Sequence, residues 1–221
     1  MLWLSLGENG LADAMLERHG RKSFNTPYSF CRCNIDHALQ LEREGYEQLL
    51  DPGKLTVAEA GGRRIVRSTS VTACAPVFSA DHSRGFEFTH HDPIASEQDR
   101  QSLRRRIDRL NAVRGRQDIV FLYHHQQHAR SCPDLVREKL ALFAGLYRSV
   151  RARCHVVMFH QAIAPTPKER RLHMAGATEG VFDFAVHSLK PWNDREPSGF
   201  GAREDDDLLK ALFGRVDSLI R

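Results

Sequence analysis

Four apolar segments of this chain end in histidine, and they limit how the chain can fold. Each is rich in valine, isoleucine, leucine or phenylalanine, as buried β-strands are. The segments are residues 86–91, 119–125, 156–160 and 181–187. Strands that alternate with helical patterns favour a parallel sheet, and ligands bind such a sheet beyond the carboxyl ends of its strands. We therefore expect the histidines to line one polar pocket.

The remaining patterns complete an α/β arrangement. Residues 2–6 predict a first strand, residues 7–10 a glycine turn, and residues 11–19 a helix that ends at Gly20. Further helices are predicted over residues 35–50, 97–111, 133–150 and 208–220, with short strands at 64–68 and 76–78 and a turn at 61–62. No repeat or linker divides the chain. The sequence predicts a single three-layer α/β domain over residues 1–221, Rossmann-like, with a mainly parallel central sheet.

Composition limits the class of protein and its partners. The 221 residues are 41% hydrophobic and 27% charged, as in an ordinary soluble domain. A net charge of +4 does not require a nucleic-acid partner. No apolar run approaches the roughly 20 residues of a membrane span, and the run at residues 2–6 is too short for a signal peptide. The five cysteines, an odd number without regular spacing, favour reduced thiols and a cytoplasmic location.

The turn between the first strand and the first helix is the first candidate site. Backbone N–H groups at a helix N-terminus can hold an anion or a developing oxyanion. Asn9 adds a side-chain donor to the same turn. The alternative is a tight connection in which glycine is needed for positive φ.

A second candidate is the pair His90 and His91, followed by Asp92. Successive residues at a strand end point to opposite faces, so one of the two rings is expected to face the cleft. Asp92 could orient that imidazole, as the third member of a catalytic triad does. The alternative is a pair of surface histidines, with Asp92 starting the turn at Pro93.

A metal-dependent hydrolase is a further alternative. If a helical turn starts at residue 124, His124 and His128 share a face, and His91 or Asp92 could complete a zinc site. No Cys-x-x-Cys or His-Glu-x-x-His pattern supports such a site, so we expect neither a metal nor another cofactor.

Two other features have a functional and a structural interpretation. The arginines between residues 100 and 116 could bind phosphate, but most are expected to form the solvated side of a helix. Trp192 belongs to a late loop that either covers the pocket or only packs against the body of the protein. The sequence leaves both interpretations of Trp192 open.

Several motifs resemble a bacterial family described as papain-like cysteine peptidases, formerly a domain of unknown function. The motifs are residues 5–10, 26–29, 34–36, 85–92, 121–125 and 202–207. The family also looks similar to enzymes that acylate bacterial surface polysaccharides. The resemblance implies a hydrolase or acyltransferase that acts on a small molecule, a glycan or a peptide. It also implies that His90 or His91 is the base.

The chain departs from this family at one position. The resemblance implies a cysteine at the start of the first helix, where the helix N-terminus favours the thiolate, but the chain has Gly10 there. The nearest thiols in sequence are Cys31 and Cys33, and the nearest matched hydroxyl is Ser29. The leading hypothesis is a cysteine-peptidase-like hydrolase without the usual nucleophile, and the alternative is a non-catalytic module that binds a sugar or a peptide. The candidate catalytic residues are Asn9, Gly10, His90, His91, Asp92 and His124.

Overall fold

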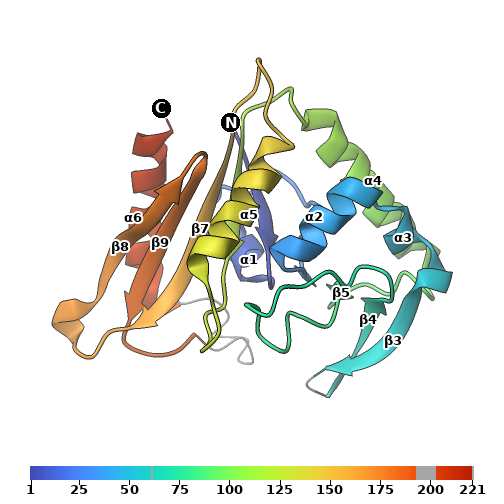
Figure 1. Ribbon diagram of the computed structural model, residues 1–221, viewed down its shortest axis with the longest axis horizontal. Coiled ribbons are helices and arrows are strands. Elements are labelled where there is room, and N and C mark those ends of the chain that lie inside the picture. Colours follow the sequence, from blue (N-terminus) through green and yellow to red (C-terminus); the bar gives the residue numbers. More distant parts are fainter. Residues whose placement is uncertain (61, 193–202, 221) are drawn as a thin grey trace.

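A five-stranded sheet forms the centre of the protein (Figure 1). The computed structural model describes residues 1–60, 62–192 and 203–220. The strand order is β1-β6-β7-β9-β8, and only β8 is antiparallel to its neighbour. The bounds are Leu2–Gly7 for β1, Ile119–His124 for β6, Cys154–Ile163 for β7, Arg171–Thr178 for β8 and Val181–Ser188 for β9.

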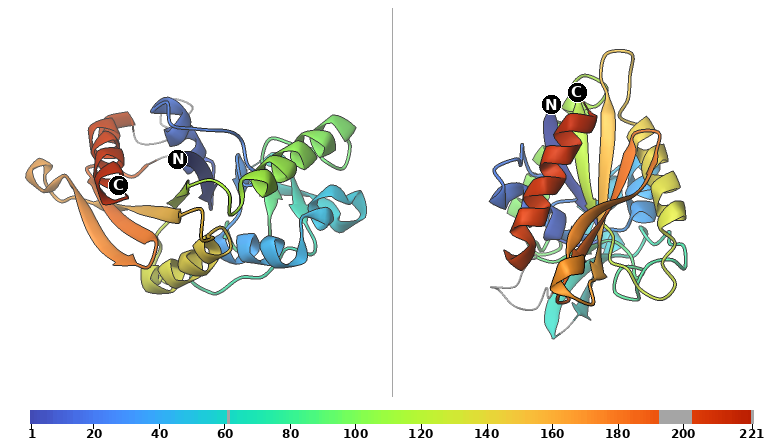
Figure 2. Two further views of the ribbon diagram at one scale, coloured as in Figure 1. Left: turned by 90° about the horizontal axis from the view of Figure 1, so that it is seen from above. Right: turned by 90° about the vertical axis from the view of Figure 1, so that its left-hand side faces the viewer.

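Helices cover both faces of this sheet (Figure 2). On one face lie α1 (Leu11–Arg18) and α6 (Asp206–Leu219), which share a hydrophobic cluster with the sheet. On the other lie α2 (Ile35–Glu44) and α5 (Pro133–Gly145). The predicted three-layer α/β architecture with a mainly parallel central sheet is confirmed.

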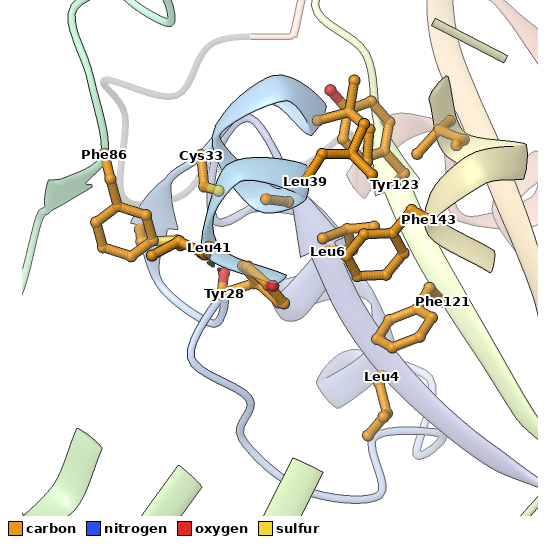
Figure 3. Packing of buried hydrophobic residues seen from close by; sticks show 14 of the residues in the cluster. Leu4, Leu6, Tyr28, Cys33, Leu39, Leu41, Phe86, Phe121, Tyr123 and Phe143 are labelled. Carbon is orange, nitrogen blue, oxygen red and sulfur yellow. Dashed lines mark hydrogen bonds between the residues drawn. The ribbon is translucent and has the colours of Figure 1, made fainter. Parts of the chain in front are cut away.

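The larger core lies on the face of α2 and α5. Alternate residues of a strand share a face, so Leu4 and Leu6 of β1 point the same way as Phe121 of β6. Figure 3 shows these side chains meeting Phe143 of α5, and all four are fully buried. The same hydrophobic cluster includes Phe88 of the second sheet, so the two sheets share one core.

Two helices end earlier than the periodicity predicts. The helix expected over residues 35–50 breaks at Gly45, whose φ is 81°, and resumes as the single turn α3 (Glu47–Leu50). The helix expected over 133–150 ends at Gly145. The α4 helix (Glu97–Val113) begins at Ser96, whose hydroxyl accepts the Asp99 N–H. Short 3-10 helices are η1 (Pro52–Lys54), η2 (Pro167–Glu169) and η3 (Arg203–Asp205).

A second, antiparallel sheet has the order β2-β5-β4-β3. Its strands are β2 (Cys31–Arg32), β3 (Leu55–Ala60), β4 (Arg63–Ser68) and β5 (Glu87–Phe88). The strand expected at 64–68 is confirmed as β4, whereas residues 76–78 form turns and a bend.

The segment 86–91 was expected to be a strand that carries its histidines to the common pocket, and this prediction is wrong. Only Glu87 and Phe88 are in a strand, and that strand belongs to the second sheet. The side chain of Glu87 is buried and pairs with Arg32 of β2 at 3.2 Å and Arg67 of β4 at 2.6 Å. A buried carboxylate needs such partners, and these two lie on the flanking strands of the second sheet.

Within the described residues, no helix is both long enough and apolar enough to cross a membrane.

Candidate active site at the first turn

The turn after β1 places Gly10 at the N-cap of α1. Its φ of −72° and ψ of 1° are accessible to residues with side chains. The backbone conformation at position 10 therefore does not require glycine. The alternative interpretation, in which glycine is needed here for a positive φ, does not apply. A Cβ at Gly7 would lie 3.4 Å from the backbone nitrogen of His124, which is an ordinary van der Waals contact.

Asn9 and His124 meet at this turn. Gly7 and His124 are register partners, so His124 ends its strand beside the turn. Oδ1 of Asn9 accepts a hydrogen bond from the backbone N–H of Leu11 at 3.1 Å, which identifies this atom as the oxygen of the amide. The same oxygen lies 3.2 Å from Nδ1 of His124. Nδ1 must therefore carry the proton, and Nε2 of the neutral ring keeps a free lone pair, as a general base requires.

Two aromatic rings pack against His124. The ring centroids of Phe159 and Trp192 lie 5.0 and 5.6 Å from that of His124. The indole N–H of Trp192 donates to Asp205 at 2.9 Å, and its backbone N–H donates to Gln161 at 2.9 Å. Trp192 therefore covers the histidine and is held there from two sides. Residues 193–202 lie outside the described residues.

Burial sets the charge state of His124, which is only 6% exposed. Burial lowers its pKa to about 3; the charge of Glu8 opposes this shift, and His125 and His82 add to it. His124 is consequently uncharged at neutral pH, and so low a pKa makes it a weak base until an anion, such as a thiolate beside it, offsets the burial.

Acidification is expected to destabilise the protein through His124. Its pKa is about 3 in the folded chain and about 6.5 when unfolded. The unfolded chain therefore binds more protons between these values, and stability is lost as the pH falls below about 6.5. At about pH 5 the loss through this one group is about 2 kcal/mol. Urea unfolding at about pH 7.5 and about pH 5 measures it.

His124→Gln is the matched control for this titration, because glutamine can still donate to Asn9 but does not titrate. Other groups also make the free energy of unfolding depend on pH, but they do so equally in both chains. One of them is the buried His37, whose pKa is lowered by burial to about 4. The variant should lose about 2 kcal/mol less than the wild type on acidification. An identical loss in both chains would show that His124 is not a buried neutral group.

Glu8 of the same turn is the centre of a buried hydrogen-bond network. Its Oε1 accepts from the hydroxyl of Tyr123 at 2.8 Å and from Nδ1 of His125 at 2.6 Å. Its Oε2 accepts from the backbone N–H of Gln126 at 3.1 Å and lies 3.2 Å from Nδ1 of His82. Glu8, Tyr123 and His125 are fully buried, and His82 is 3% exposed. The network joins the end of β1 to the end of β6.

Glu8 is ionised in spite of its burial. Burial alone raises the pKa of Glu8, but hydrogen bonds from His125 and His82, together with their charges, hold it well below its ordinary value. Nε2 of His125 is buried without a hydrogen-bond partner in the described structure. Glu8 was not among the predicted site residues. The available signal was a carboxylate directly after a buried apolar strand, because such a group needs a buried partner.

His91 and Asp92 belong to a different set of contacts. Nδ1 of His91 lies 3.3 Å from Asp99, and its Nε2 lies 3.0 Å from a nitrogen of Arg106. Asp92 pairs with Arg64 and caps the turn that follows Pro93. The expected pairing of Asp92 with His90 or His91 is absent from the described contacts, since α4 and β4 supply the partners instead.

The described contacts of His90 and His91 do not include the first turn. The cavity beside His91 and Ser29 has a volume of about 10 Å³, which is space for about one water molecule. His90 packs edge-on against Phe30 at 5.9 Å. Among the described residues, no hydrogen bond, ion pair or ring contact joins His90 or His91 to residues 7–10. The structure thus joins Asn9, the neighbour of Gly10, to His124, whereas the described contacts of His90, His91 and Asp92 are with Phe30, α4, β4 and the turn after Pro93.

The thiols and the hydroxyl considered as replacement nucleophiles are already engaged. Sγ atoms of Cys31 and Cys33 donate to backbone carbonyls at 3.0 and 3.5 Å. Burial raises the pKa of Cys33 well above its ordinary value, and the neighbouring Cys31 raises it further. The Ser29 hydroxyl accepts the N–H of Thr26 at 3.0 Å and shares a hydrogen bond with Ser5 at 2.9 Å. None of the three is hydrogen-bonded to a histidine in the described structure.

The residues proposed as a metal site are separated. Residues 125–128 are not helical, so His124 and His128 do not share a helical face. Nε2 of His128 lies 2.8 Å from the carbonyl of Val77, and His91 is held by α4. In the part of the chain that the structure describes, no group of three or more histidine, cysteine or acidic residues could hold a metal ion.

Comparison with known proteins places these features in a family. The family model described as "Putative papain-like cysteine peptidase (DUF1796)" matches residues 1–163. The match includes the first turn and His124, whereas β8, β9 and α6 lie beyond it. No curated protein and no solved structure matches the chain. Because this family model covers well over half of the 221 residues, the chain belongs to the DUF1796 family.

Proposed function

We propose that this chain is a hydrolase-like member of the family in which Gly10 occupies the position of the nucleophilic cysteine. The observation that carries the proposal is the contact between Asn9 and His124 at the start of α1. It supplies a neutral, oriented imidazole beside a helix N-terminus, which is the environment that activates a thiol.

In a member with cysteine at this position, the chemistry follows from the same geometry. Nε2 of His124 accepts the thiol proton, and the thiolate forms a bond to the acyl carbon of the substrate. The histidine then returns the proton to the leaving group as the acyl bond breaks, and water releases the acyl group. We assign the base role to His124 rather than to His90 or His91, because His124 contacts Asn9, the neighbour of Gly10 in the chain.

The test restores the missing thiol. Gly10→Cys is compared with Ala211→Cys, which places a thiol at an exposed position in the middle of α6, both in a chain whose exposed Cys132 is replaced by serine. Labelling by iodoacetamide at neutral pH should be about tenfold faster at position 10, because a thiol whose pKa is lowered by about one unit has about ten times more thiolate. Adding His124→Gln to the Gly10→Cys chain should remove most of this advantage. If cysteine at position 10 reacts no faster than the control, the site assignment is rejected.

A non-catalytic binding module is the second candidate. It is favoured by the engagement of Cys31, Cys33 and Ser29 in buried hydrogen bonds, which leaves the wild-type site without a free nucleophile. The wild type should show weak or no hydrolysis of peptide and ester libraries. Turnover that is lost in His124→Gln would exclude the binding module and would show that another group performs the chemistry.

Free thiols at all five cysteines fit a reducing, cytoplasmic setting.

A further inference from the structure

Three histidines and an arginine meet on the sheet, away from the first turn. His160 of β7 and His173 of β8 are both register partners of Ala185 in β9, and His187 is the partner of Arg171. Register partners share a face, as do residues two apart in a strand. His160, Arg171, His173 and His187 therefore lie on one face, which we call the histidine face.

The histidine face is separate from the proposed catalytic site. Neighbouring residues of a strand point to opposite faces, so His160 points away from the face on which Phe159 packs against His124. The rings of His173 and His187 lie 6.5 Å apart. His173 is exposed, His187 is half-buried and His160 is 5% exposed.

The acidic side chain beneath this face is already neutralised. Oδ2 of Asp183 accepts from Arg137 of α5 at 2.9 Å, and its Oδ1 lies 3.1 Å from Nδ1 of His160. These two side chains do not form a hydrogen bond with each other. Nδ1 of His160 and Oδ1 of Asp183 are each buried without a hydrogen-bond partner in the described structure. Arg137 also pairs with Asp134.

The charge of the face depends on its histidines. Arg171 makes no ion pair with any carboxylate among the described residues. Burial lowers the pKa of His187, the charges of Arg171, His173 and His160 lower it further, and Glu169 raises it. The titratable or charged groups that neighbour this face are His160, His173, His187, Arg171, Arg137, Asp183, Asp134 and Glu169. With the histidines protonated, the cations of this set exceed its carboxylates.

We propose that the histidine face binds an oxyanion, of the phosphate or carboxylate class, and that it does so more tightly in mildly acidic solution. Protonated imidazoles and an unpaired guanidinium donate hydrogen bonds to such a group and carry the opposite charge. This binding site is independent of the chemistry proposed for position 10, and either can fail without the other.

The test uses sulfate as the probe, because its charge is constant over the relevant pH range. Imidazole resonances of the full-length chain are followed during sulfate titration at constant ionic strength, at about pH 5.5 and about pH 8. Resonances of His160, His173 and His187 should shift saturably at the lower pH, with affinity about tenfold weaker at the higher pH, as the loss of about one proton predicts. The ring of His155, on the other face of β7, is the internal control.

Two variants decide the assignment. Arg171→Gln on the edge strand β8 and His187→Gln on the adjacent strand β9 should each weaken sulfate binding at least about threefold, while His155→Gln should leave it unchanged. Circular dichroism confirms that each variant is folded. Competition by acetate or by methyl phosphate shows which class of oxyanion is preferred. Shifts that do not saturate, or equal sulfate binding by the wild type, Arg171→Gln and His187→Gln, would overturn the proposal.

Discussion

Replacing Glu8 with alanine is expected to lower the free energy of unfolding by about 3–5 kcal/mol, the effect of removing one partner from a buried charge network. The carboxylate is fully buried and accepts from Tyr123, His125 and the backbone of Gln126. Its removal leaves a tyrosine hydroxyl and an imidazole N–H without partners in a site that water does not reach. Urea unfolding at neutral pH measures the change.

Two variants test whether the effect comes from this network. Glu8→Gln keeps the shape and an acceptor oxygen, and should cost less than alanine, by at least about 1 kcal/mol. Glu138→Ala, at an exposed position on α5, should change stability by no more than about 0.5 kcal/mol. A loss below about 1 kcal/mol in a folded Glu8→Ala chain would contradict the description of Glu8 as a buried, ionised hub.

Glu42→Ala is the second substitution with a large expected effect, again about 3–5 kcal/mol. The side chain of Glu42 on α2 is fully buried. It accepts from the hydroxyls of Tyr28 at 2.7 Å and Tyr147 at 2.5 Å, and it also binds Tyr46 and Arg114. Alanine would leave these donors unsatisfied, including the charge of the half-buried Arg114. Thermal or urea unfolding of the variant measures the loss.

Tyr147→Phe measures how much one hydrogen bond to Glu42 contributes to stability. It removes one donor to Glu42 and keeps the ring that lies 4.3 Å from the guanidinium carbon of Arg114. The expected cost is about 1 kcal/mol. If Tyr147→Phe destabilised the protein as much as Glu42→Ala, the carboxylate would not be the centre of the cluster.

The predictable part of the fold rests on local pattern. The segments over residues 119–124 and 181–187 are apolar and β-branched enough to be read as strands. Gly45 interrupts a helical periodicity that continues on both sides of it, so a pattern of apolar residues alone does not reveal the break. The strand Leu55–Ala60 was missed because only one of its six residues is buried and its apolar signal is weak.

The candidate site depends on contacts between residues far apart in the chain, which a local sequence pattern does not predict. A short apolar run that ends in histidine can join either sheet. For residues 86–91 the choice depends on the ion pairs of Glu87, whose partners are 55 and 20 residues away in the chain. His90 and His91 were therefore predicted at the wrong sheet. Asn9 and His124 were both identified, but their contact spans 115 residues and depends on the pairing of β1 with β6. Whether residues 1–221 fold as one cooperative domain remains a prediction, and the core shared by the two sheets supports it.

The protonation state of His124 tests the central claim most directly. Long-range proton–nitrogen NMR spectra of the imidazole distinguish the two neutral tautomers and the cation. The ring should carry its proton on Nδ1 and remain neutral from about pH 8 down to about pH 5, whereas in Asn9→Ala the tautomers should mix. A proton on Nε2, or titration of His124 near pH 6.5 in the wild type, would contradict the assignment of this histidine as the oriented base of the first turn.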